Sequence, residues 1–373
     1  MDTPLERKII DRIREEGCIT FEAFMDMALY DPCYGYYCSE DLSIGKAGDF
    51  YTSAHLHPVF GAMLGRQMRE MWEFMGSPAF FTLVEVGGGE GHICRDMLDS
   101  LRGDAFFDAL RYVIVEINPA MQKKQYALLG DLAGKVRWVS SLAEAGHVRG
   151  CIFSNELLDA FPVHLVEMQE TLQEIYVAVK DGGLALQAGP PSSPLLEKYL
   201  AAASVVLERG YRTEINLRVR DWLRDVGACL DQGFLLTIDY GYTARDYYSE
   251  DRNRGTLVCY YRHQMNEDPL EHPGSQDITS HVDFSAVKRG GDEFGLRSLG
   301  LSSQGAYLVS LGIDEEIQRL AATSADYPTE LARIKKLIMP QGMGDSHMVM
   351  AQYKGPGAPV LRGFALRNQL RYL

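Results

Sequence analysis

The segment that most constrains this chain is an apolar run that leads directly into a glycine-rich turn and then into a helical pattern. Residues 83–92 read LVEVGGGEGH, so a buried strand ends where the glycines begin. Glycines let a ligand approach the backbone closely, and the N-terminus of the next helix presents free N–H groups. We therefore expect a ligand at Gly87, Gly88, Gly89 and Gly91, with a tight turn that binds nothing as the alternative interpretation.

Strand and helix signals alternate along the segments that follow this turn. Short apolar runs of strand length are separated by amphipathic patterns with helical spacing. This alternation predicts an α/β fold, with a mostly parallel sheet and helices on both faces. The expected strands lie at 81–86, 112–117, 136–139, 151–154, 234–238 and 349–353.

The same patterns predict how the chain is organised. Helical stripes dominate before residue 77, and a β-hairpin signal around Asp181 and Gly182 interrupts the alternation after Pro162. A polar, aromatic-rich stretch at 241–283 is too long for an idle connection. The expected parts are a helical accessory region at 1–76, a first part of the sheet domain at 77–162, an inserted subdomain at 163–215, a second part with the functional loop at 216–355, and a tail at 356–373.

The net charge narrows the class of partner. The chain has 37 Lys and Arg against 51 Asp and Glu, which gives a net charge of −14. Nucleic-acid-binding proteins usually carry a basic stripe that displaces phosphate counterions, and no basic run here is longer than two residues. We expect no nucleic-acid partner and favour a basic or cationic one.

The spacing of the cysteines and of the apolar residues predicts whether the chain binds a metal, spans a membrane or is exported. The seven cysteines form no C-x-x-C pair and no cluster with zinc spacing, so we expect reduced thiols and no metal site. No segment approaches 18 consecutive apolar residues, which predicts no membrane span. The first residues include Asp2 and Glu6 and lack a signal-peptide core, and with the reduced thiols they predict a cytoplasmic location.

Two carboxylates distinguish between candidate ligands of the glycine turn. Glu116 ends the next strand, 25 residues after Gly91, where a carboxylate accepts both ribose hydroxyls of an adenosine ligand. The third glycine of a dinucleotide fingerprint is replaced by His92. Glu85 would repel a pyrophosphate, but it suits an ammonium and a sulfonium group. These residues favour S-adenosyl-L-methionine over a nicotinamide cofactor, and an oxidoreductase remains the less favoured alternative.

Further acids follow the fourth strand of the pattern. Ligands of an open α/β sheet bind beyond the carboxyl ends of its strands, so Asn155, Glu156 and Asp159 should face the cofactor. The Asn/Asp-Pro-Pro-Tyr/Phe motif of methylases that act on exocyclic base nitrogens is absent, which again argues against DNA. Acidic residues suit a cationic acceptor, whereas the alternative role for Glu156 and Asp159 is to cap a helix start.

By these motifs the sequence resembles the MidA-like class I methyltransferases, which are related to the mitochondrial arginine methyltransferase that assists assembly of respiratory complex I. The resemblance runs almost the full length of the chain and includes the acid–glycine turn from Glu85 to Gly91. The other matching stretches are ITF (19–21), FM (24–25), ALYDP (28–32), YGYY (34–37), GDFYTS (48–53), VFG (59–61), SNE (154–156), PVH (162–164), IDYG (238–241), GTL (255–257), QDITSHVDF (276–284) and MG (343–344).

The sequence departs from the family pattern in two motifs. The family usually has G-P-G-R-G-T at the turn and T-S-P-E after the N-terminal loop, so Glu90 stands for an arginine and His55 for a glutamate. The resemblance implies a Rossmann-like sheet with an antiparallel last strand, S-adenosyl-L-methionine as cofactor and S-adenosyl-L-homocysteine as product. It also implies methyl transfer to a protein arginine, with a respiratory-complex subunit as a candidate substrate.

The expected reaction is an in-line methyl transfer to a positioned side chain. The carboxylates expected to bind the guanidinium and receive its proton are Glu156, the preferred candidate, and Asp159, the second candidate. His281 and Asp283 are expected to reach the same cleft, although a histidine more often fills a structural position. The alternative function is a cofactor-binding assembly or scaffold factor that methylates little, which the changes at Glu90 and His55 keep open.

Cofactor contacts are expected from several parts of the chain. Glu85 and the glycine turn would hold the methionine end, and Asn155 would face the cofactor. Leu142, beyond the third strand, would pack on adenine. Asp49 and Thr52 would close over the cofactor from the N-terminal loop, with a turn-capping role as the alternative for the aspartate.

Overall fold

The computed structural model describes residues 3–39, 53–262 and 264–373. The chain forms two compact units and passes repeatedly from one to the other. The first unit comprises Met1–Phe50, Leu158–Trp222 and Tyr242–Val287, and the second comprises Tyr51–Leu157, Leu223–Gly241 and Lys288–Leu373. Residues 53–76, which were expected to belong to the N-terminal accessory region, lie in the second unit.

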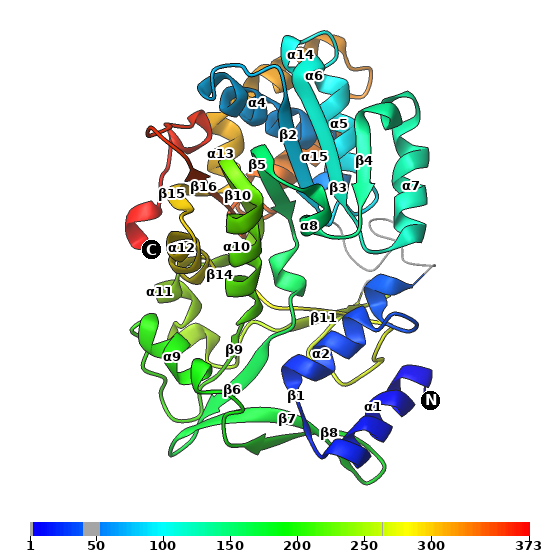
Figure 1. Ribbon diagram of the computed structural model, residues 1–373, viewed down its shortest axis with the longest axis vertical. Coiled ribbons are helices and arrows are strands. Elements are labelled where there is room, and N and C mark those ends of the chain that lie inside the picture. Colours follow the sequence, from blue (N-terminus) through cyan, green and yellow to red (C-terminus); the bar gives the residue numbers. More distant parts are fainter. Residues whose placement is uncertain (1–2, 40–52, 263) are drawn as a thin grey trace. The chain divides into compact units, whose positions relative to one another are not determined.

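The second unit contains most of the regular structure, which is labelled in Figure 1. Its helices and strands are α3 (Ser53–Leu56), α4 (Val59–Phe74), β2 (Phe81–Val86), α5 (His92–Ser100), α6 (Ala105–Ala109), β3 (Leu110–Val115), α7 (Pro119–Leu129), η2 (Gly130–Lys135), β4 (Val136–Val139), α8 (Leu142–Ala145), β5 (Val148–Asn155), β10 (Leu230–Tyr242), β15 (Arg297–Ser303), α13 (Gln304–Ser310), α14 (Ile313–Thr323), α15 (Tyr327–Ile338), β16 (His347–Lys354), η5 (Arg362–Phe364) and η6 (Leu370–Tyr372).

The first unit has shorter elements. They are α1 (Pro4–Glu16), β1 (Ile19–Thr20), α2 (Phe21–Tyr30), η1 (Tyr36–Cys38), η3 (Leu158–Ala160), β6 (His164–Met168), β7 (Leu172–Lys180), β8 (Gly183–Gly189), α9 (Pro194–Ala202), β9 (Arg212–Ile215), α11 (Ala244–Tyr247), η4 (Glu250–Arg252), β11 (Val258–Tyr261), β12 (Gln264–Asn266), β13 (Asp277–Thr279) and β14 (Val282–Asp283). Helices α10 (Arg218–Cys229) and α12 (Phe284–Glu293) each contribute residues to both units.

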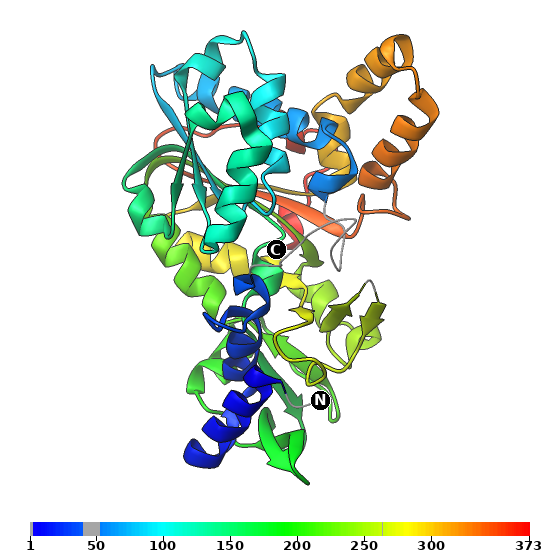
Figure 2. The same cartoon turned by 90° about the vertical axis from the view of Figure 1, so that its right-hand side faces the viewer.

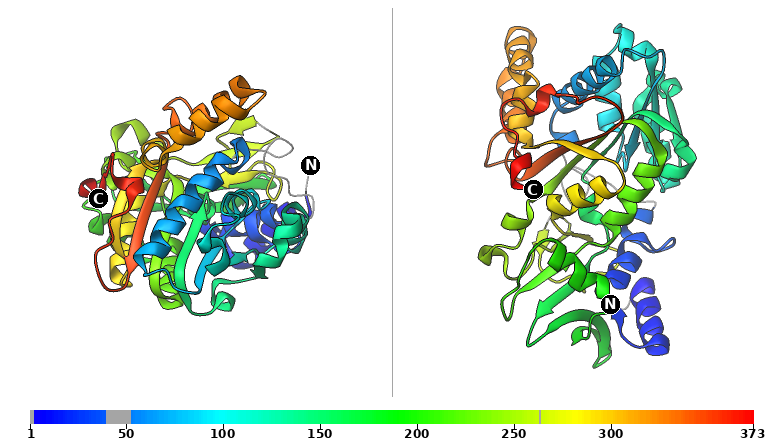
Figure 3. Two further views of the ribbon diagram at one scale, coloured as in Figure 1. Left: turned by 90° about the horizontal axis from the view of Figure 1, so that it is seen from above. Right: turned by 60° about the vertical axis from the view of Figure 1, so that its left-hand side comes forward.

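The central sheet of the second unit has the strand order β15-β16-β10-β5-β2-β3-β4. Strands β10, β5, β2, β3 and β4 are parallel, and β16 is antiparallel to both of its neighbours. Residues of β2 on both faces are buried, which is typical of a parallel sheet covered by helices on both sides. Figure 3 shows these helices. The predicted α/β class, with its antiparallel last strand, is confirmed.

The strand order reverses between β2 and β5. The chain proceeds from β2 outward to β3 and β4, and then returns to add β5 and β10 on the other side of β2. The connections after β2 and β5 therefore leave in opposite directions, which opens a crevice at the carboxyl ends of these strands. The glycine turn follows one strand and Asn155–Glu156 follows the other, so the sheet topology brings both predicted segments to one place.

A row of small residues lets three strands of this sheet approach closely. Thr82 of β2 pairs with Gly150 of β5, and Gly150 pairs with Gly233 of β10. Both glycines have positive φ angles, 153° and 140°. A Cβ atom on Gly150 would overlap the carbonyl oxygen of Thr82, and one on Gly233 would overlap that of Gly150. These positions require glycine for both conformation and space.

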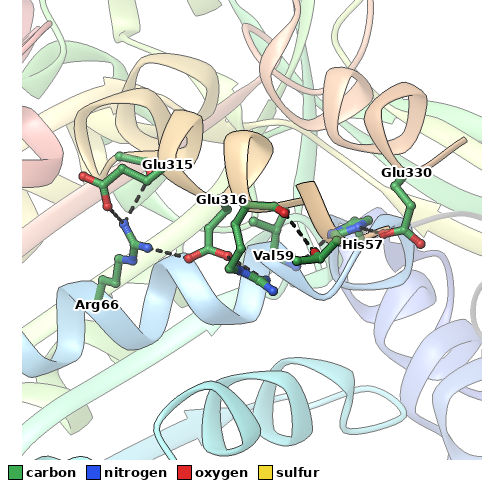
Figure 4. A network of polar contacts seen from close by, with 9 residues as sticks. His57, Val59, Arg66, Glu315, Glu316 and Glu330 are labelled. Atoms are coloured by element: carbon green, nitrogen blue, oxygen red, sulfur yellow. Dashed lines mark hydrogen bonds and ion pairs between the residues drawn. The ribbon is translucent and has the colours of Figure 1, made fainter. Parts of the chain in front are cut away.

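Helix α4 is fixed to α14 and α15 by polar contacts that Figure 4 shows. Arg66 Nη2 lies 2.5 Å from Glu316 Oε1 on α14. His57 Nδ1 accepts a hydrogen bond from Val59 N–H at 3.0 Å, so the Nε2 proton of the neutral ring points to Glu330 on α15, 2.8 Å away. Figure 2 shows α14 and α15 as a pair of neighbouring helices drawn in orange. A large apolar core packs between the sheet and these helices.

The first unit is built on antiparallel strands. Its larger sheet has the order β1-β7-β6-β9, with β8 paired to β7, and a smaller sheet has the order β12-β11-β13. Asp181 and Gly182 have φ angles of 52° and 84°, which confirms the predicted hairpin turn between β7 and β8. At the start of α1, Thr3 and Glu6 form a capping box.

Several strands differ from the sequence expectation. Strands β2 and β4 have the predicted bounds, whereas β10 extends well beyond the predicted 234–238. Strand β15 was not expected from the sequence, because its Ser- and Gly-rich segment lacks an apolar run and lies at the edge of the sheet. Edge strands need less apolar surface than central ones, so their patterns are weaker.

The close strand spacing can be tested at Gly150. We predict that Gly150→Ala lowers the free energy of unfolding by about 2 kcal/mol or more, because the new methyl group meets backbone of β2 at a φ angle that alanine disfavours. Gly134→Ala in η2 is the matched control, since nothing lies near its Cβ position. Its effect should stay within about 0.5 kcal/mol. Equal urea-unfolding midpoints for both variants would contradict the interpretation.

Candidate functional site

The glycine turn connects β2 to α5 at the reversal of strand order. Gly87, Gly89 and Gly91 have φ angles of 71°, 52° and 90°, a backbone path that other residues rarely adopt. Gly87 N–H donates to the carbonyl oxygen of Val115 at 3.1 Å, which holds the start of the turn against β3. A Cβ atom on Gly87 would lie 3.0 Å from Leu157 Cδ1. The turn therefore presents bare backbone at the end of the sheet.

Glu85 lies beneath this turn. Its side chain is buried, and Tyr112 donates a hydrogen bond from its hydroxyl to Glu85 Oε2 at 2.7 Å. A Cβ atom on Gly88 would lie 3.4 Å from the Glu85 carboxyl carbon, so the carboxyl group supports the turn from below. Burial raises the pKa of Glu85 to about 8, and the Tyr112 hydrogen bond opposes this shift.

Glu116 follows β3 at the same edge of the sheet. Its Oε1 atom accepts a hydrogen bond from Asn118 N–H at 2.9 Å, and its Oε2 atom accepts one from Gln125 Nε2 at 3.1 Å. Burial raises the pKa of this carboxyl group, while the hydrogen bonds from Asn118 and Gln125 lower it. These two donors fix the orientation of the carboxyl group.

Gln125 connects Glu116 to the glycine turn and was not predicted from the sequence. Its Nε2 atom also donates to the carbonyl oxygen of Gly89 at 2.7 Å, and its Oε1 atom accepts from Trp138 Nε1 at 2.8 Å. The side chain is fully buried although it lies on a helix with many polar residues. Nothing local distinguishes Gln125 from the exposed polar residues of α7, so only the fold identifies it.

Glu156 lies just beyond β5 in a conformation unusual for glutamate. Its φ angle is 51°, and the carboxylate oxygen Oε1 accepts hydrogen bonds from Ser53 N–H at 3.1 Å and from Asn155 Nδ2 at 3.2 Å. His347 Nε2 lies 3.7 Å from the same oxygen. A non-glycine residue in the left-handed region is held there by its surroundings, which is frequent at functional sites.

Ser53 links the chain before α4 to this site. It is fully buried, and its hydroxyl lies 3.0 Å from Gln304 Oε1 and 3.3 Å from Met343 Sδ. Asp239 of β10 accepts hydrogen bonds from Leu157 N–H and Tyr240 N–H, and so joins the segment after β5 to the neighbouring strand β10. Ser53, Asp239 and Met343 belong to the motifs of the family resemblance, whereas Gln304 and His347 were not singled out.

A cluster of His55, Glu90 and His92 contains the two charge-changing departures from the family pattern, Glu90 and His55. His55 Nε2 lies 3.8 Å from Glu90 Oε2, and His92 Nε2 lies 3.6 Å from the same oxygen. The two imidazole ring centroids are 4.7 Å apart. Burial lowers the pKa of both imidazoles, more than Glu90 raises it. The two substitutions are neighbours in space, although 35 residues separate them in the sequence.

Asp159 and His281 lie in the first unit and come close to each other through the backbone. Ser280 N–H donates to the carbonyl oxygen of Asp159 at 3.0 Å. His281 N–H donates to the Thr256 hydroxyl at 3.0 Å, and its ring centroid lies 5.2 Å from that of Tyr242. The fold thus brings together two predicted catalytic residues that are more than one hundred positions apart.

The remaining predicted site residues have simple placements. Leu142 is buried at the start of α8, after the N-cap residue Ser141. The Oδ1 atom of Asn155 is buried and accepts no hydrogen bond from any residue that the structure describes. Asp49 and Thr52 lie outside the described residues.

Among the described helices, none is long and apolar enough to cross a membrane.

The buried carboxyl of Glu85 should leave a signature in stability. The folded protein keeps this proton up to about pH 8, whereas the unfolded carboxyl loses it near 4.5, so the free energy of unfolding falls as pH rises through this range. We predict that Glu85→Gln removes this contribution in the ligand-free protein and flattens the decline by up to ~1.4 kcal/mol per pH unit.

Urea unfolding at several pH values between about 5 and about 8 measures this slope. Glu170→Gln, at an exposed residue paired with Arg209, is the control and should follow the wild-type curve. An identical slope in Glu85→Gln and wild type would show that Glu85 is ionised in the folded protein.

Comparison with known proteins agrees with this geometry. Residues 63–302 match the family model described as "Putative S-adenosyl-L-methionine-dependent methyltransferase". The chain is 27% identical to the protein arginine methyltransferase NDUFAF7 homolog, mitochondrial, of Drosophila melanogaster, over 94% of this chain and 85% of that protein. It is 26% identical to NDUFAF7 of Mus musculus, over 92% of this chain and 83% of the relative.

A solved structure is similar over nearly the whole chain. The crystal structure of a Burkholderia thailandensis protein bound to S-adenosyl-homocysteine has a TM-score of 0.91 and 31% identity, and the match covers 99% of this chain and 96% of that one. A native crystal structure from the same organism has a TM-score of 0.89 at 31% identity, with the same coverage. The predicted family resemblance is confirmed.

These relatives correct one prediction. The cytoplasmic location is wrong by this comparison, because the curated relatives from fly, mouse and human are all named as mitochondrial proteins. The prediction rested on cysteine pattern and on the first residues of the sequence, and neither feature specifies a compartment.

Family and fold lead to the same conclusion. The family model covers well over half of the chain, and the topology places a glycine turn and several carboxyl groups at the crevice where such proteins bind their cofactor. The chain therefore belongs to this family and is an S-adenosyl-L-methionine-dependent methyltransferase.

Proposed function

We propose that this methyltransferase transfers the methyl group to an arginine side chain of a protein. The observation that carries the proposal is the Glu156 carboxylate, which is held beyond the end of β5 by Ser53 N–H and Asn155 Nδ2. A fixed carboxylate in this place suits a cationic acceptor. The names of the fly and mouse relatives support arginine as that acceptor.

The residues around the turn fit the cofactor. A backbone cradle at Gly87–Gly91 can approach the methionine end, with the Glu85 carboxyl group beneath it. The oriented carboxyl of Glu116 can accept the ribose hydroxyls. The buried Oδ1 of Asn155 needs a donor, which the amino groups of the cofactor offer. Leu142 is proposed to pack on adenine, and Asp49 and Thr52 remain predicted contacts.

S-Adenosyl-L-methionine, when bound, supplies an activated methyl group on a sulfonium and leaves as S-adenosyl-L-homocysteine. The guanidinium group of the acceptor stays protonated at neutral pH, so it must be oriented and its charge shared. We assign this role to the Glu156 carboxylate, which accepts N–H hydrogen bonds and receives the proton that the attacking nitrogen loses.

Two further residues are proposed to act on the acceptor. Asp159 is the second carboxylate, three residues after Glu156, and its buried position near Ser280 restricts its movement. His281 follows directly and is proposed as a catalytic residue of the same step. The family resemblance predicts a respiratory-complex subunit as the protein that carries the arginine.

The cofactor assignment can be tested at Glu116. We predict that Glu116→Ala weakens S-adenosyl-L-homocysteine binding by about tenfold to a hundredfold, because the ribose loses a charge-assisted acceptor. Calorimetric titration measures this change, and Asp131→Asn, at an exposed aspartate in η2, is the control. Unchanged affinity in a folded Glu116→Ala protein would place the ribose elsewhere.

The acceptor assignment can be tested at Glu156. We predict that Glu156→Gln lowers methyl transfer by about 10²–10⁴-fold, while S-adenosyl-L-homocysteine affinity stays close to that of wild type. The isosteric amide keeps an oxygen for Ser53 N–H but loses the proton acceptor. Glu144→Gln, at an exposed residue of α8, is the matched control.

The assay uses methyl-labelled cofactor with arginine-containing peptides and with matched peptides in which lysine replaces arginine. Label recovered as methylarginine after hydrolysis supports the proposal. Label recovered on lysine contradicts the choice of acceptor. Cofactor binding without transfer to any peptide or to a respiratory-complex extract would favour an assembly factor instead of an enzyme.

A further inference from the structure

The side chains of His55, Glu90 and His92 have no assigned role in the proposed methyl transfer, although the backbone of Glu90 belongs to the glycine turn. One carboxylate oxygen of Glu90 lies 3.8 Å from His55 Nε2 and 3.6 Å from His92 Nε2. The potential ligand atoms of all three residues lie within 4.8 Å of one another. Both separations are within the range of an ion pair, and the three side chains converge on a common point.

The distances suit a metal ion between the three atoms. A tetrahedral site with ligand bonds of about 2.0–2.2 Å has its ligand atoms about 3.3–3.6 Å apart. The two separations from Glu90 lie at or just above this range, and the ligand atoms of all three residues lie within 4.8 Å of one another. Small rotations of the side chains would therefore complete the site.

The types of ligand indicate which metals would bind. Ca²⁺ and Mg²⁺ are bound by oxygen ligands, whereas imidazole suits Zn²⁺, iron, nickel and copper. A set of two histidines and one carboxylate binds the metal in both zinc enzymes and non-haem iron enzymes. The cluster therefore fits a divalent transition metal of the first row.

The three side chains are held by separate, well-anchored elements. His55 lies on α3, whose first residue Ser53 is buried against Gln304. Glu90 belongs to the glycine turn, and His92 is the first residue of α5. The side chains of His55, Glu90 and His92 are 12%, 24% and 22% exposed, so the cluster is shielded but reachable from solvent.

We propose that His55, Glu90 and His92 form a binding site for a divalent first-row transition metal, with Zn²⁺ and Fe²⁺ as the two candidates. Three protein ligands leave at least one coordination position for water or for a donor atom of a small molecule. The family pattern of the resemblance has arginine and glutamate at positions 90 and 55, so this ligand set departs from that pattern. It is independent of the proposed acceptor.

The test uses the full-length protein. Elemental analysis after purification identifies the resident metal and separates Zn²⁺ from Fe²⁺. Chelator-treated protein is then dialysed against Zn²⁺, and we expect one equivalent to bind. His55→Gln, Glu90→Gln and His92→Gln should each weaken binding by at least about tenfold. His147→Gln, at an exposed histidine paired with Asp231, is the matched control and should bind as wild type does.

A second measurement needs no variant. Co²⁺ added to the chelator-treated wild-type protein should give the visible d–d bands of a nitrogen–oxygen site, without the charge-transfer band of a thiolate ligand. A thiolate band would show that one of the seven cysteines binds the metal and would overturn the proposal. Failure of the wild type to bind either ion, or equal affinities in all variants, would also overturn it.

Discussion

The reversal of strand order between β2 and β5 is the constraint on which the candidate site depends. Connections leave the two strands in opposite directions, and ligands of open α/β sheets bind at the carboxyl ends of strands at such a reversal. The glycine turn and Glu156 lie at these two strand ends. Close packing of β2, β5 and β10 through Gly150 and Gly233 keeps the two ends adjacent. The geometry of the site therefore depends on strand packing at Gly150 and Gly233, several residues before the ends of these strands.

The site is rich in carboxyl groups whose environments differ. Glu85 is buried beneath the turn with one hydrogen bond from Tyr112, and burial raises its pKa to about 8. Glu116 is also buried, but donors contact both of its oxygens. Glu156 is held by a backbone N–H and an amide at the edge of the sheet. Residues of one chemical type can therefore support the turn, orient a ligand or face an acceptor.

Local features of the site could be predicted from the sequence because each leaves a local pattern. The turn follows from its glycines, and the position of Glu116 follows from its place after a buried strand. Gln125, His347 and Gln304 could not be predicted, because each contacts the site through residues distant in the sequence. The same holds for the cluster at Glu90. Its histidine and glutamate ligands have no recognisable spacing, and only the packing of α3 against α5 joins them.

The central claim is that the crevice after β2 and β5 binds S-adenosyl-L-methionine through the turn and the Glu116 carboxyl group. A crystal structure of this protein with S-adenosyl-L-homocysteine tests it most directly. The account predicts the ribose hydroxyls within hydrogen-bond distance of Glu116 and the methionine end against Gly87–Gly91, with Asn155 Oδ1 accepting a hydrogen bond. A ligand seated elsewhere, with Glu116 still bonded only to Asn118 and Gln125, would contradict it.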